Sequence, residues 1–74
     1  MASKTWHLII HTIPPERREA LIQYCQLTSK VDETFKIKQI DKHIIIELPT
    51  KDRCHKVGML LHHRFNIYYE VERS

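Results

Sequence analysis

Histidine is the residue type with the greatest capacity for chemistry in this chain, since six occur among 74 residues. A metal site would need several of them to converge on one ion. His7 and His11 would lie ~13 Å apart along a strand, and His55 and His63 would lie ~12 Å apart on a helix. The sequence also has no Cys-x-x-Cys motif. We therefore expect no bound metal and no cofactor, and we interpret the histidines as titrating surface or interface groups.

The two cysteines and the single glycine limit the catalytic mechanisms open to the chain. Cys25 and Cys54 fall on the apolar faces of predicted helices, which is typical of buried thiols. Cys54 and His55 are adjacent, so on a helix they point ~100° apart and cannot form a nucleophile–base pair. A glycine-rich phosphate loop cannot be built with Gly58 alone. The sequence therefore predicts a protein that is not an enzyme.

The composition is that of an ordinary globular protein, with 42% hydrophobic and 28% charged residues. A net charge of +3 is a weak indication of anionic partners. The apolar run at residues 8–10 is too short for the core of a signal peptide or for a membrane span. Two cysteines do not make a disulfide framework. We expect a cytoplasmic protein without membrane association.

Six segments use up nearly the whole chain. Apolar residues alternate with polar ones at 5–12, 34–41, 43–48 and 67–72, which predicts strands. Helical spacing of apolar residues predicts helices at 15–28 and 51–63. Pro14 and Pro15 end the first strand and suit the start of a helix, and Thr50 is a good N-cap for the second helix. Gly58 inside that helix indicates close packing against a neighbouring element.

The second and third strands can be aligned if Asp41 and Lys42 form the turn between them. This register puts apolar side chains opposite one another on one face and opposite charges across from one another on the other face, as cross-strand energetics favour. The predicted pairs are Phe35–Leu48, Ile37–Ile46 and Gln39–Ile44 on the first face, and Lys36–Glu47, Lys38–Ile45 and Ile40–His43 on the second.

This order of elements resembles the ferredoxin-like, split β-α-β arrangement. The resemblance rests on pattern over residues 1–74, which we interpret as a single compact domain. Right-handed crossovers would give a four-stranded antiparallel sheet in spatial order 4-1-3-2, with both helices on one face. The predicted core consists of Trp6, Leu8, Ile10, Leu21, Tyr24, Phe35, Ile37, Ile44, Ile46, Leu48, Val57, Leu61, Ile67, Tyr69 and Val71.

The opposite face of such a sheet would be open, and it is the predicted working surface. An antiparallel sheet can simply expose one face to water. Here, however, the outward positions combine aliphatic side chains at the centre with basic and aromatic ones around them. The predicted binding residues are His7, Ile9, His11, Lys36, Lys38, His43, Ile45 and Tyr68.

Two functions compete for these residues. An aliphatic centre inside a polar rim favours binding of another protein or of a second copy of this chain, as a regulator, inhibitor or adaptor. RNA-recognition modules share the topology and stack bases on aromatic side chains of their central strands. Those positions here carry histidine and isoleucine, but Tyr68, Lys36 and Lys38 leave binding of RNA or single-stranded DNA as the alternative.

Overall fold

The computed structural model describes residues 5–40 and 43–73. They form β1 (Trp6–Thr12), α1 (Pro15–Val31), β2 (Lys36–Ile40), β3 (His43–Leu48), α2 (Lys51–Phe65) and β4 (Tyr68–Arg73). The strands make one sheet in the order β2-β3-β1-β4, and all neighbouring strands are antiparallel. Read from the other edge this is the predicted order 4-1-3-2, so the ferredoxin-like fold is confirmed.

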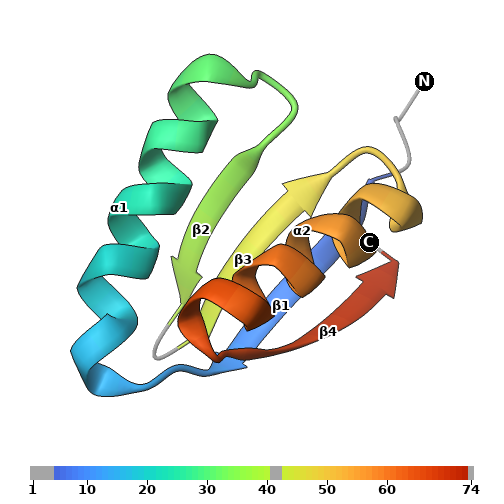
Figure 1. Cartoon of the computed structure of the whole chain (residues 1–74). Helices are drawn as coiled ribbons and strands as arrows, with labels where there is room; N and C mark the ends of the chain where they lie inside the picture. The colour runs from blue at the N-terminus through green and yellow to red at the C-terminus, as the bar shows by residue number, and fades with distance from the viewer. Residues whose placement is uncertain (1–4, 41–42, 74) are drawn as a thin grey trace.

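Both helices cover the same face of the sheet (Figure 1). Helix α1 packs along the edge strand β2, whereas α2 lies over β1 and β4. Between the helices and the sheet lies the core. On the other face, no element of the described chain covers the strands.

Apolar side chains from both helices and from the sheet fill this core. Every residue predicted for the core lies there. Trp6, Tyr24, Ile37, Val57, Tyr69 and Val71 are partly buried against its centre. Burying this apolar surface is the main driving force for folding. The side chains at the centre, each at most 2% exposed, are Leu8, Ile10, Leu21, Cys25, Phe35, Ile44, Ile46, Leu48, Cys54, Leu61 and Ile67.

The register of β2 against β3 is the predicted one. Ile37 lies opposite Ile46, and Lys36 lies opposite Glu47. The predicted strand began at residue 34, but β2 begins at Lys36, so Phe35 precedes it and the pairing with β3 starts at Lys36 and Glu47. The Phe35 side chain is nevertheless buried. The turn predicted at Asp41 and Lys42 lies outside the described residues.

Helix α1 ends one turn later than predicted, at Val31 rather than near residue 28. Residues 29–31 are polar or β-branched, but none of them is a helix breaker. Asp32 is the C-cap residue, and its backbone is extended. Its side chain accepts a hydrogen bond from the backbone N–H of Thr34 (3.0 Å). This local side-chain bond competes with continuation of the helix.

Helix α2 has well-formed ends and a close contact in its middle. The Thr50 hydroxyl accepts a hydrogen bond from the backbone N–H of Arg53, which confirms the predicted N-cap. Asn66 ends the helix in the left-handed conformation, with φ of 55°. A Cβ atom at Gly58 would lie 2.6 Å from the ring of Tyr69 in β4. Glycine is therefore needed there because the helix lies directly on that ring.

We predict that Gly58→Ala destabilises the protein by about 1–2 kcal/mol, because the clash with Tyr69 outweighs the higher helix propensity of alanine. In a Tyr69→Val background, the same change should instead stabilise by up to about 1 kcal/mol. Chemical denaturation of the four proteins measures both effects. Stabilisation by Gly58→Ala in both backgrounds would contradict the close contact.

Candidate functional site

The surface opposite the helices, called the open face below, consists of the outward positions of all four strands. Its identity follows from alternation: Ile44, Ile46 and Leu48 of β3 are buried, whereas Ile45 and Glu47 between them remain partly exposed. The outward positions are Lys36, Lys38 and Ile40 of β2, His43, Ile45 and Glu47 of β3, His7, Ile9 and His11 of β1, and Glu70 and Glu72 of β4.

Two isoleucines occupy the centre of the open face. Ile9 and Ile45 lie directly opposite one another on the two middle strands, and both are half-buried. Lys38 is the other cross-strand neighbour of Ile45, and Glu70 is that of Ile9. One row across the sheet therefore reads Lys38, Ile45, Ile9, Glu70, with an apolar centre between opposite charges.

Glu47 organises the next row. Its Oε2 lies 3.3 Å from Nε2 of His7 and 3.9 Å from Nζ of Lys38. Because a carboxylate can only accept, His7 is the donor in the shorter contact. The Glu47 side chain is 22% exposed, against 63% for Lys38. Lys36 lies opposite Glu47 as predicted, but the ion pair that forms is the diagonal one to Lys38.

The charges on the open face are separated by sign between its two edges. Lys36 and Lys38 lie on the edge strand β2, and Glu70 and Glu72 lie on the edge strand β4. Sequence reasoning selected the lysines as site residues but missed these glutamates and Glu47. The predicted strand order 4-1-3-2 already placed β2 and β4 at opposite edges, and comparing the charges of these two strands could have found them.

The remaining predicted site residues lie away from the isoleucine pair. His43 and His11 are exposed at the far ends of β3 and β1. The register of β1 against β4 shifts between Ile10 and Thr12, and β4 begins beside this irregularity. The ring of Tyr68 lies 5.7 Å, between centroids, from His62 of α2. Tyr68 therefore contacts the helix layer at the sheet edge rather than the central rows that hold His7, Ile9, Lys38 and Ile45.

Clusters of metal-ligating side chains and cavities are the features that could support further chemistry. Within residues 5–40 and 43–73, no group of three or more His, Cys, Asp or Glu side chains could hold a metal ion. A cavity of about 310 Å³ lies at the end of the sheet beside Glu47 and Lys36. Its other lining residues are Thr5, Glu33, Thr34, Leu48 and Pro49. A larger cavity of about 450 Å³ is lined by His11, Ile13, Pro15 and Arg18. Neither described helix is long and apolar enough to cross a membrane.

The two thiols are core groups. Cys25 and Cys54 are free cysteines, and both are completely buried. Burial raises the pKa of the Cys25 thiol to about 12 and also raises the pKa of Cys54. Desolvation disfavours the thiolate, which is the nucleophilic form.

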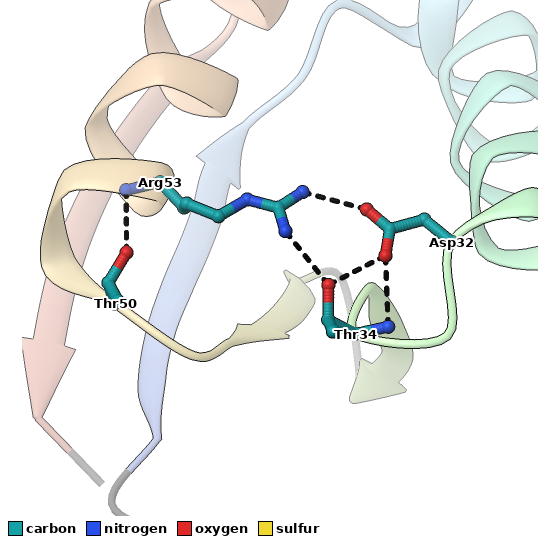
Figure 2. A network of polar contacts seen from close by, with 4 residues as sticks. All are labelled: Asp32, Thr34, Thr50 and Arg53. Carbon is teal, nitrogen blue, oxygen red and sulfur yellow. Dashed lines mark hydrogen bonds and ion pairs between the residues drawn. The ribbon is translucent and has the colours of Figure 1, made fainter.

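A polar network joins the end of α1 to the start of α2 (Figure 2). The Thr34 hydroxyl donates to Oδ1 of Asp32 (2.6 Å), and Arg53 donates to Oδ2 of Asp32 (2.7 Å). Arg53 also donates to the Thr34 hydroxyl (2.9 Å). Hydrogen bonds from the Thr34 hydroxyl, from Arg53 and from the Thr34 backbone N–H lower the pKa of Asp32 to about 2. These groups satisfy one another's hydrogen-bonding capacity, so we interpret the network as a structural link between the two helices.

We predict that both thiols react slowly in the folded protein and rapidly after denaturation, because the buried thiolate is disfavoured and inaccessible. Labelling with a maleimide, followed by mass spectrometry, measures both rates. Rapid modification of Cys25 and Cys54 in native buffer would place them on the surface and contradict the assigned helix faces.

We predict that Thr34→Val or Arg53→Met raises the pKa of Asp32 from about 2 towards the ordinary value of 3.8. Since the folded-state pKa is lowered, this carboxylate stabilises the fold fully above about pH 4, and the contribution is lost as the pH falls through 2. An NMR titration of the side-chain carboxyl carbons measures the midpoint.

A matched control is Asp52→Asn, which removes an exposed carboxylate paired with Lys56 in the same helix. It should leave the titration midpoint of Asp32 unchanged. An Asp32 midpoint that stays near 2 in both the Thr34 and the Arg53 variants would contradict the network as its cause.

Comparison with known proteins adds no relative. No protein-family model matches the chain, and no curated protein and no solved structure matches it significantly. Functional reasoning therefore starts from the geometry of the open face.

Proposed function

We propose that this chain is a non-enzymatic protein-binding module that acts through the open face, as a regulator, inhibitor or adaptor of its partner. The observation that carries the proposal is the half-buried pair Ile9 and Ile45 at the centre of a charged face. An apolar centre within a polar rim is the usual anatomy of a protein interface. The proposed location is the cytoplasm, where two free buried thiols fit a reducing compartment.

The charges of the open face favour a protein over a nucleic acid as its partner. A surface that follows a phosphate backbone needs basic side chains along its length. Lys36 and Lys38 supply two, but Glu47, Glu70 and Glu72 share the face, and Glu47 already contacts Lys38. These carboxylates would repel phosphates, whereas a protein partner can match both signs.

We predict that an Ile9→Asp, Ile45→Asp double variant loses partner binding while remaining folded, because it places charges at the apolar centre without touching the core. An Ile9→Thr, Ile45→Thr variant, which keeps β-branched side chains in the strands, should weaken binding in the same direction. Affinity capture from a host lysate, with and without nuclease treatment, compares both variants with wild type, and circular dichroism confirms folding.

The helix layer supplies the matched control. Leu60 on α2 is 44% exposed, so Leu60→Asp introduces the same charge on the opposite side of the molecule and should leave capture intact. Capture lost with Leu60→Asp but kept with the double variant would move the working surface to the helices. Capture that nuclease treatment abolishes would favour the nucleic-acid alternative.

A further inference from the structure

The open face has an electrostatic pattern that one partner can match without any further assumption, namely a second copy of the same face. Two adjacent rows cross the sheet in the order β2, β3, β1, β4. One row reads Lys36, Glu47, His7, Glu72, and the other reads Lys38, Ile45, Ile9, Glu70. Each row is basic at its β2 end and acidic at its β4 end.

Symmetry determines how two such faces meet. Most homodimers have a two-fold axis, which brings the same surface of both copies together. If the axis runs parallel to the strands, between β3 and β1, it places β2 of one copy over β4 of the other. If it runs across the strands, it places β2 over β2 and β4 over β4. These are the two face-to-face arrangements that keep the strand directions of the two sheets aligned.

The axis parallel to the strands makes both rows complementary. Lys36 then faces Glu72 of the second copy, and Lys38 faces Glu70 of the second copy. At the centre, Ile45 faces Ile9 of the second copy, and Glu47 faces His7 of the second copy. Each of these contacts occurs twice. With the axis across the strands, the lysine-bearing edge β2 would instead face itself, and the glutamate-bearing edge β4 would face itself, so like charges would repel.

From this complementarity we infer that the partner of the open face is a second copy of this chain. The two copies bind with their strand axes aligned and with β2 of one copy over β4 of the other. The inference rests on the proposed function and specifies its partner. Aligned packing of two sheets ~10 Å apart, with strands within about 30° of each other, suits this rotation. The apolar centre would be covered, and the four edge charges of each copy would be paired.

The size of the face sets the expected strength of the dimer. Four strands of about six residues span roughly 20 Å by 20 Å. That is small beside the ~800 Å² that each partner contributes to a standard interface. We therefore expect a dissociation constant in the micromolar range or weaker. Sedimentation equilibrium of the purified chain, from about 1 µM to 1 mM, should show a mass rising from 8.9 kDa towards twice that value.

Charge reversal tests which edges meet. Lys36→Glu with Lys38→Glu should weaken the dimer about tenfold or more, because β2 and β4 then carry the same sign. Glu70→Lys with Glu72→Lys should do the same. A fourfold variant that combines all these changes keeps the net charge and restores the complementarity with itself. It should self-associate like wild type but fail to pair with wild type, as native mass spectrometry of the mixed proteins would show.

Each outcome bears on a separate part of the inference. A chain that stays at 8.9 kDa up to 1 mM would overturn self-association, while binding of another protein through Ile9 and Ile45 would still stand. A fourfold variant that pairs with wild type better than with itself would overturn the axis parallel to the strands. A dimer that is lost in Leu60→Asp and kept in Ile9→Asp, Ile45→Asp would overturn both this inference and the open face as the working surface.

Discussion

Side-chain alternation on the two middle strands is the constraint from which the rest of the structure follows. Leu8 and Ile10 of β1 and Ile44 and Ile46 of β3 are fully buried beneath the helices. Because successive side chains point to opposite faces, Ile9 and Ile45 must then point away from the helices. A shift of one residue would exchange the two sets. The same register therefore defines both the hydrophobic core and the surface available to a partner.

Three contacts outside the core join the helices to the sheet and to each other. Gly58 lets α2 lie directly on the ring of Tyr69. Tyr24 of α1 and Phe65 of α2 bring their rings within 5.7 Å. At the other end, Arg53 reaches Asp32 and Thr34. Together with the core, these contacts fix both helices on one side, so the strands carry the whole of the opposite surface.

Much of this arrangement was predictable from the sequence, because alternation and helical spacing are local patterns. The register of β2 and β3 follows from matching Lys36 to Glu47 and Ile37 to Ile46, and the structure has these pairs. Other features depend on interactions that no local pattern contains. The end of α1 depends on a hydrogen bond that the Asp32 side chain accepts from the backbone N–H of Thr34. Tyr68 contacts His62 beside an irregularity in the pairing of β1 with β4, which no local pattern reveals.

The site was less predictable than the fold for a related reason. Sign separation on the open face joins Lys36 and Lys38 to Glu70 and Glu72, which are more than thirty positions away in sequence. The predicted strand order already placed β2 and β4 at opposite edges, but the separation becomes visible only when the charges are compared along each row across all four strands. The isoleucines, by contrast, stand out from alternation alone, because Ile9 and Ile45 interrupt otherwise polar positions.

Protection of the edge strands against pairing with other chains does not by itself account for the opposite charges of β2 and β4. Charged side chains, especially lysine, are a common means of preventing edge strands from pairing with other chains. Two edges of the same sign would repel one another and protect best. In the proposed dimer, the lysines on β2 and the glutamates on β4 would instead face the opposite edge of another copy. A chain selected only to remain monomeric would gain nothing from this pattern, whereas a chain that pairs face to face gains both attraction and a defined orientation.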